Sequence, residues 1–325
     1  MTEPALPVAA LEVVIGIALL WRAADAFVEG AANIAGSLRI SPVVIGAVII
    51  GFGTSLPELL VSAIAATNGN LDLGVGNVVG SNVANLTLVL GAAALIVPLF
   101  VTRPILAREA PLSLLSVLLF GFFTLDGLTR FEGSVLLAAL VLAMSWIVFA
   151  GREEVLEGVH LDGARTLTGE VVGTLLGLIG TVLGAQLLVW GALAIADALD
   201  LSGGLVGFTL VAVGTSLPEL VTAVAAARQG ETGLILGNLL GSNMFNSLAV
   251  GGAIAMLGGG VIDDRGLATV GVLGMALVAF AAWAFMVTRR RVHRIEAIVL
   301  LSVWAGSVVL MAGDNPDAIT ALFGS

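Results

Sequence analysis

GTSLPEL at residues 53–59 and GNVVGSNVAN at 76–85 occur a second time in this chain, as GTSLPEL at 214–220 and GNLLGSNMFN at 237–246. Residues 46–91 and 207–252 align without a gap at a constant offset of 161, and 20 of the 46 aligned positions are identical. The chain therefore contains two related halves, and the same polar residues occupy equivalent places in both.

The sequence around both copies is strongly apolar. Hydrophobic residues make up 58% of the chain and charged residues 11%, and the mean hydropathy is +1.11. Soluble domains carry about 25% charged residues, whereas a membrane-spanning helix needs about 20 mostly apolar residues. The composition predicts an integral membrane protein. Because the chain has no cysteine, and both histidines fall in polar connections, disulfides and thiolate or histidine metal sites are excluded.

Apolar runs between polar, Gly or Pro breaks predict an all-α membrane fold of ten transmembrane helices. We expect the spans at residues 7–35, 41–66, 72–98, 109–125, 130–150, 170–198, 204–228, 233–259, 266–288 and 295–313. A hydrophilic connection at 151–169 separates a first five-helix repeat, residues 1–150, from a second, residues 170–325. Because five is odd, a tandem copy crosses the membrane in the opposite direction, which predicts two inverted repeats.

The arginines, which are the only basic residues, predict the orientation. Ten of the thirteen lie in the connections after spans 1, 3, 5, 7 and 9, against two on the other side, Arg130 and Arg265. The positive-inside rule then places both termini outside and residues 151–169 in the cytoplasm. The first span has neither a basic N-terminal region nor an A-x-A cleavage site, so we expect no removable signal peptide.

Glu58 and Glu219 lie deep inside predicted spans, at equivalent positions of the two halves. An acidic side chain at a helix centre costs about 2.5–3.5 kcal/mol on insertion scales, so each glutamate is expected to face a cavity and to have a function. Pro57 and Pro218 directly precede them, and a proline cannot donate to the carbonyl four residues earlier. At membrane depth such a carbonyl is tolerated only where it lines a cavity. The pairing of proline and glutamate, twice, favours a site over a simple kink.

Helical spacing gathers more oxygen donors around the glutamates, because Thr54 and Ser55 precede Glu58 by four and three residues and share its face. The candidate ligands are Glu58, Glu219, Thr54, Thr215, Ser55, Ser216, Ser81, Ser242, Asn85 and Asn246. Oxygen-only shells suit Ca²⁺, Mg²⁺, Na⁺ or a proton rather than zinc or copper. Two carboxylates, two Thr carbonyls and water would supply the about 6–8 oxygens that Ca²⁺ takes. The two carboxylates would also neutralise the charge of the divalent ion. We expect Asn77, Asn82, Asn238 and Asn243 to pack helices or support ligands from behind.

The paired GTSLPE and GSN-x-x-N segments resemble the alpha repeats of the calcium/cation antiporter superfamily, particularly the prokaryotic sodium/calcium exchangers. In that family the two motif glutamates bind Ca²⁺, and neighbouring Thr, Ser and Asn or Asp residues complete the Ca²⁺ and Na⁺ sites. The resemblance implies a multi-pass antiporter of the inner (plasma) membrane that exchanges Ca²⁺ for Na⁺ by alternating access. It implies inorganic cations as substrates and lipid as surroundings, with no cofactor, no nucleic acid and no protein partner.

One position departs from the family pattern. Well-studied archaeal members carry Asp where this chain has Asn246, so here two carboxylates stand in place of three. Two carboxylates can release one Ca²⁺ by taking up two protons, which keeps a Ca²⁺/H⁺ antiporter on the same scaffold as the alternative.

Two other classes of protein fit the sequence poorly. An intramembrane enzyme could use paired carboxylates as acid and base, but no GxGD or Ser–His pattern is present and inverted duplicate motifs would serve no purpose in it. A structural membrane scaffold gives no reason for buried glutamates. We therefore expect a transporter and not an enzyme.

Overall fold

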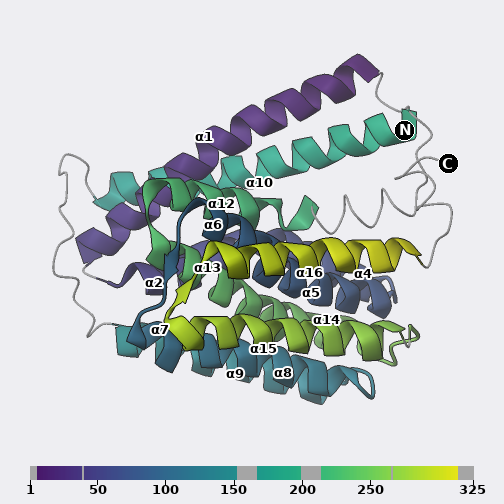
Figure 1. Cartoon of the computed structure of the whole chain (residues 1–325). Helices are drawn as coiled ribbons and strands as arrows, with labels where there is room; N and C mark the ends of the chain where they lie inside the picture. The colour runs from purple at the N-terminus through teal and green to yellow at the C-terminus, as the bar shows by residue number, and fades with distance from the viewer. Residues whose placement is uncertain (1–5, 39, 152–166, 199–213, 265, 314–325) are drawn as a thin grey trace.

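The computed structural model describes residues 6–38, 40–151, 167–198, 214–264 and 266–313, and these form helices almost throughout (Figure 1). The first half contains α1 Leu6–Leu38, α2 Pro42–Ile45, η1 Gly46–Ile50, α3 Gly51–Thr54, α4 Leu56–Thr67, α5 Leu71–Ala84, η2 Asn85–Val89, α6 Leu90–Ile96, β1 Leu99–Phe100, α7 Arg103–Ala107, α8 Glu109–Thr124 and α9 Arg130–Gly151. The second contains α10 Leu167–Ala198, α12 Leu217–Gln229, α13 Thr232–Phe245, η3 Asn246–Val250, α14 Gly251–Gly258, η4 Leu267–Gly271, α15 Val272–Arg289, β2 Arg291–Val292 and α16 Arg294–Gly313. The η elements are single π-helical turns inside longer helices.

The predicted helices coincide with helix wherever the structure describes the chain. The predicted span 204–228 begins in residues 199–213, outside the described residues, and only its second part is seen, as α12. Most of the connection 151–169 also lies outside them. By length and apolarity, seven described helices could cross a membrane, or eight if the bent pair Pro42–Thr54 and Leu56–Thr67 is one span.

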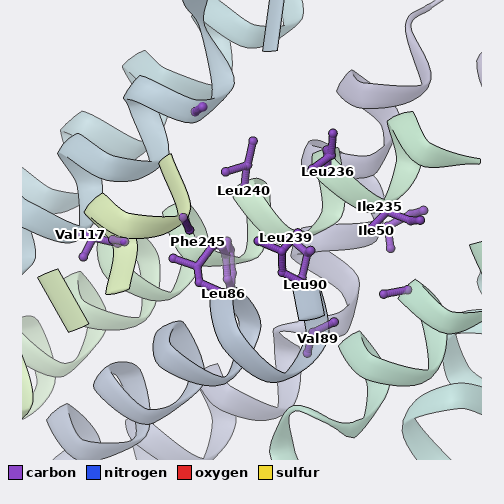
Figure 2. Close-up of a cluster of buried hydrophobic side chains, with 14 of the residues drawn as sticks. Ile50, Leu86, Val89, Leu90, Val117, Ile235, Leu236, Leu239, Leu240 and Phe245 are labelled. Atoms are coloured by element: carbon purple, nitrogen blue, oxygen red, sulfur yellow. The ribbon is translucent and has the colours of Figure 1, made fainter. Parts of the chain in front are cut away.

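The core lies around the helix formed by α13, η3 and α14. In the most apolar 18-residue stretch of this helix 89% is buried, whereas 22% is buried in the corresponding stretches of α1 and of α9. Figure 2 shows the cluster around α13, in which apolar side chains of η1, η2, α6 and α8 surround those of α13. Its labelled members are Ile50, Leu86, Val89, Leu90, Val117, Ile235, Leu236, Leu239, Leu240 and Phe245. This core holds the helices that carry the repeated motifs.

The outer helices present large apolar side chains to the surroundings. Phe131 and Leu142 of α9 are 76% and 71% exposed, and Val270 and Leu277 in η4 and α15 are 75% and 69% exposed. Extensive apolar surface of this kind marks contact with a membrane or a partner. Together with the long apolar helices, this surface fits a multi-pass membrane protein.

Helices α1 and α10 form a long antiparallel pair that slants across the other helices (Figure 1). Glycines allow the close approach: a Cβ on Gly184 would lie 2.8 Å from the backbone nitrogen of Leu20, and one on Gly16 would lie 2.7 Å from that of Leu188. Small residues at such positions let membrane helices pack through their backbones.

The connections between helices meet in two groups. At one end, β1 pairs with β2 antiparallel, and the guanidinium of Arg291 lies 3.9 Å from the ring centroid of Phe100. At the other end Leu128 forms a β-bridge with Gly260, and the Asp72 carboxylate accepts the backbone N–H of Asp263 at 2.9 Å. The segments that follow α6 and α15 therefore lie together at one end. At the other end, the first turn of α5 lies with the segments that follow α8 and α14.

Candidate ion-binding site

The motif GTSLPE breaks its helix at the serine. The helices on either side of Ser55 differ in direction by 44°. Pro57 has no N–H to donate to Gly53, and the backbone bonds across the break run from Ser55 to the Gly51 carbonyl at 3.3 Å and from Leu59 to the Ser55 carbonyl at 3.2 Å. Pro57 therefore lies in the first turn of a new helix, α4, so the span expected at residues 41–66 is divided at Ser55.

The second copy of the motif has the same local form. Ser216 precedes α12 with φ −88° and ψ 5°, and Ser55 has φ −87° and ψ 7°. In both halves the proline occupies the first turn, and the glutamate follows it in that turn. A helix N-terminus carries partial positive charge from its unpaired N–H groups, which stabilises a carboxylate at this position.

Glu58 and Glu219 are almost fully buried, at 1% and 0% exposure, and the two carboxylates lie close enough to repel each other. The ion pairs found among the described residues, Arg108 with Glu109 and Arg228 with Asp25, involve neither of them. Burying an unpaired charge costs several kcal/mol, even after the surrounding protein relaxes. The pair therefore favours a cation or protons as its partner.

Hydroxyl groups cross between the halves to the two carboxylates. Ser55 of the first half donates to Glu219 Oε1 at 3.0 Å, and the hydroxyl of Thr54 also lies beside that carboxylate. In return, Thr215 of the second half lies beside the Glu58 carboxylate, together with Ser81. The structure thus brings Thr54, Ser55, Ser81 and Thr215 together with the two glutamates.

The serines and asparagines of the second motif lie one helix away. Ser81 and Ser242 are buried in α5 and α13, and Asn85 and Asn246 each begin a π-helical turn, η2 and η3. Such turns widen a helix locally and are frequent at functional sites. Ser242 lies 3.3 Å from the Gly51 carbonyl, and Asn85 donates to Asn243 Oδ1 at 3.1 Å. Among the described residues, neither Ser216 nor Asn246 forms a hydrogen bond with a carboxylate.

Several buried oxygens of these residues have no hydrogen-bond partner in the part of the chain that the structure describes. They are Glu58 Oε1 and Oε2, Glu219 Oε2, Ser81 Oγ, Ser216 Oγ, Asn85 Oδ1 and Asn246 Oδ1. All are hard donors, and they come from both halves. Buried polar groups are normally hydrogen-bonded, so a concentration of exceptions fits the ligand chemistry of Ca²⁺ and Na⁺.

The structure also shows what the four asparagines that were expected to pack helices or support ligands contact. Asn82 donates to Ser247 at 2.9 Å, and Asn243 accepts from Asn85, so both asparagines join the two halves. Asn77 and Asn238 contact the motif threonines. The signal that could have found them is their recurrence at the same offset of 161.

Comparison with known proteins agrees with this architecture. A family model described as sodium/calcium exchanger protein matches residues 8–150 and 169–313. CaxA of Alkalimonas amylolytica, a proposed antiporter, is 40% identical over 316 residues, which cover 94% of this chain and 98% of the relative. MaX1 of Methanosarcina acetivorans, described as a sodium/calcium exchanger, is 28% identical and is covered over 97% of its length.

A solved structure leads to the same family. The sodium–calcium exchanger NCX_Mj, in crystals soaked with Na⁺ and Sr²⁺, superposes with a TM-score of 0.84 at 31% identity, covering 94% of this chain and 99% of that one. The family model, the relatives and the structural match together span nearly the whole chain. This protein therefore belongs to the sodium/calcium exchanger family of membrane antiporters.

Proposed function

We propose that this antiporter exchanges Ca²⁺ for Na⁺ by alternating access, and that Glu58 and Glu219 hold the ion between the two halves. One observation carries the proposal: two buried carboxylates at equivalent positions face each other's half, and neither takes part in an ion pair found among the described residues. Their combined charge of −2 equals that needed to neutralise Ca²⁺.

The remaining ligands are proposed from both motifs. The carbonyls of Thr54 and Thr215 next to the helix breaks and the oxygens of Ser55, Ser216, Ser81, Ser242, Asn85 and Asn246 complete the Ca²⁺ and Na⁺ positions. The unpartnered oxygens in this group support the assignment. Because the ions are cargo, the protein makes and breaks no covalent bond.

We also propose that the chain has ten spans in two inverted repeats, residues 1–150 and 170–325, and lies in the plasma membrane. Both termini are then outside the cell, and residues 151–169 are in the cytoplasm. The contacts between connections support this topology. The segments after predicted spans 3 and 9 pair as β1 and β2, and those after spans 2, 4 and 8 meet at the other end. Connections of equal parity are expected on the same side of a membrane, and these contacts fit that arrangement.

Sodium is our first choice for the coupling ion, because MaX1 and NCX_Mj are described as sodium/calcium exchangers. Asn246 favours the second candidate, Ca²⁺/H⁺ exchange. Its side-chain amide is neutral and is buried without a hydrogen-bond partner among the residues that the structure describes, so the site has two carboxylates and can balance one Ca²⁺ with two protons.

Calcium flux into proteoliposomes separates the two. We expect an outward Na⁺ gradient to drive Ca²⁺ uptake, and a potassium-set membrane potential to change the rate, since each uncompensated charge is worth about 2.3 kcal/mol per 100 mV. Flux that requires only a pH gradient and ignores both Na⁺ and voltage establishes proton exchange instead. In that case Asn246→Asp is the informative variant, because a third carboxylate gives a further monovalent cation its counter-charge and should introduce sodium dependence.

A further inference from the structure

Two equivalent asparagines, Asn77 and Asn238, each contact a threonine of the opposite half. The Thr215 hydroxyl donates to Asn77 Oδ1 at 3.5 Å, and the Thr54 hydroxyl lies 3.3 Å from Asn238 Oδ1. Asn77 and Asn238 are related by the same offset of 161 as the motifs themselves. The same cross-half contact therefore occurs twice.

Each asparagine also holds a second part of the site. Asn77 Nδ2 donates to the backbone carbonyl of Glu58 at 3.3 Å. The Asn77 amide therefore contacts both Thr215 and Glu58, and the Thr215 side chain itself lies beside the Glu58 carboxylate. Asn238 Oδ1 accepts from Ser242 at 3.3 Å as well as from Thr54, and thus joins proposed ligands of both halves.

We propose that Asn77 and Asn238 are positioning residues of the cation site: each fixes the threonine of the other half and so couples the two halves in the ion-holding arrangement. The inference rests on the proposed function, since it takes Thr54, Thr215 and the glutamates as the site. A threonine hydroxyl has one proton. While that proton is directed to an asparagine oxygen, the lone pairs of the hydroxyl and the carbonyl of the same residue stay available to a cation.

The two asparagines differ in how firmly they are held. Asn77 Nδ2 also donates to Ser62 Oγ at 2.9 Å. The equivalent of Ser62 in the second half is Ala223, whose side chain has no acceptor, and Asn238 Nδ2 has no hydrogen-bond partner among the described residues. In addition, the Thr54 hydroxyl has an alternative acceptor in the Ile50 carbonyl at 3.0 Å. Loss of Asn77 should therefore disturb the site more than loss of Asn238.

Double-mutant cycles test the crossed pairing with only four substitutions, Asn77→Ala, Asn238→Ala, Thr54→Val and Thr215→Val. The readouts are the Kd for Ca²⁺ by isothermal titration and the Tm of the ion-free protein. We expect each asparagine variant to raise Kd by about 5- to 10-fold, the scale of one lost hydrogen bond. The cycles Asn77/Thr215 and Asn238/Thr54 should be non-additive, with each double variant no weaker than its worse single variant. The swapped cycles, Asn77/Thr54 and Asn238/Thr215, use the same substitutions and should be additive.

Additive effects in the crossed cycles, or equal coupling in all four, would overturn the inference. So would an Asn77→Ala protein with a lower ion-free Tm and an unchanged Kd, because that is the behaviour of a packing residue. If Asn77→Ala does not fold, Ser62→Ala replaces it, since it removes only the 2.9 Å contact that holds the Asn77 amide. A raised Kd supports the proposal, and an unchanged Kd contradicts it.

A matched control and the wild type separate this inference from the proposed function. Ser116→Ala should leave the Kd unchanged, because the Ser116 hydroxyl bonds only the Leu112 carbonyl of its own helix among the described residues. Wild-type protein that neither binds nor transports Ca²⁺ would refute the proposed function. Wild-type protein that binds Ca²⁺, with additive crossed cycles, would refute only the role of the asparagines.

Discussion

Replacing Glu58 by Gln should remove Ca²⁺ binding without destabilising the ion-free protein. Gln keeps the size of the side chain, and the hydroxyl of Ser81 that lies beside the carboxylate can donate to its amide oxygen. The change removes a buried negative charge next to a second one on Glu219. The two consequences have opposite signs, because the ion-free protein loses a repulsion while the Ca²⁺-bound protein loses half of its counter-charge.

The size of the effect follows from burial. At 1% exposure Glu58 is shielded from solvent, so its interaction with Ca²⁺ belongs to the class of buried charge pairs. Removing one partner of such a pair costs about 3–5 kcal/mol. At 1.4 kcal/mol per factor of ten, that raises the Kd for Ca²⁺ by about 100- to 4,000-fold. Glu219→Gln should behave alike, because its amide oxygen can still accept the bond from Ser55.

Glu109→Gln is the matched control, since Glu109 is also fully buried but is paired with Arg108, whose Nε lies 2.6 Å from its carboxylate. Removing that carboxylate should lower the stability of the ion-free protein by about 3–5 kcal/mol and leave the Ca²⁺ affinity of the folded fraction unchanged. Both properties can be measured on detergent-purified protein, as the Tm in chelator and the Tm shift produced by Ca²⁺. Wild-type Ca²⁺ affinity in Glu58→Gln, or an ion-free Tm that falls as far as that of Glu109→Gln, would refute the reasoning.

Three further outcomes are expected. Lowering the pH should raise the apparent KM for Ca²⁺ in flux assays and leave Vmax unchanged, since a proton and Ca²⁺ compete for the same carboxylates; a fall in Vmax alone would point to a group outside the site. Gly184→Ala should lower the Tm, because the new Cβ would lie 2.8 Å from the backbone of α1 and overpacking of this kind costs about 1–3 kcal/mol. Gly173→Ala should leave the Tm unchanged, because a Cβ there would meet nothing within 4 Å. Burial raises the pKa of Glu231, so the folded protein holds this proton to higher pH than the unfolded chain, and stability falls as the pH rises from the ordinary value to the raised one. Glu231→Gln should flatten that part of the curve of Tm against pH, and an unaltered curve would show that Glu231 is not its source.

Much of the fold could be predicted from the repeated motifs. Apolar runs located the helices, because the bilayer leaves few alternatives to helical backbone. The two copies of the motif predicted that Glu58 and Glu219 would occupy equivalent places, and both are found buried in the first turn of a helix. Proline explained why a break occurs there, although not that Ser55 would separate two distinct helices.

The contacts between the halves could not be predicted in the same way. Helical spacing relates residues that are three or four positions apart, whereas Ser55 bonds Glu219, 164 positions away. For the same reason Asn77 and Asn238 could be expected to pack helices or support ligands, but not with which residues, since their partners lie in the other half. The pairing of β1 with β2 depends on how α6 and α15 end side by side, which no local pattern in the sequence encodes.

The central claim, that Glu58 and Glu219 together hold Ca²⁺, is tested most directly by locating the ion. Crystals of the protein soaked in Sr²⁺, whose anomalous scattering marks its position, should give a peak between the two carboxylates, with an oxygen of each as a ligand. The distances should be slightly longer than about 2.3–2.6 Å, the range of a Ca²⁺ ligand, because Sr²⁺ is the larger ion. The peak should disappear in Glu58→Gln crystals. A peak bound elsewhere, for example at Asp72 and the neighbouring Asp263 on the surface, with none between the glutamates, would contradict the account.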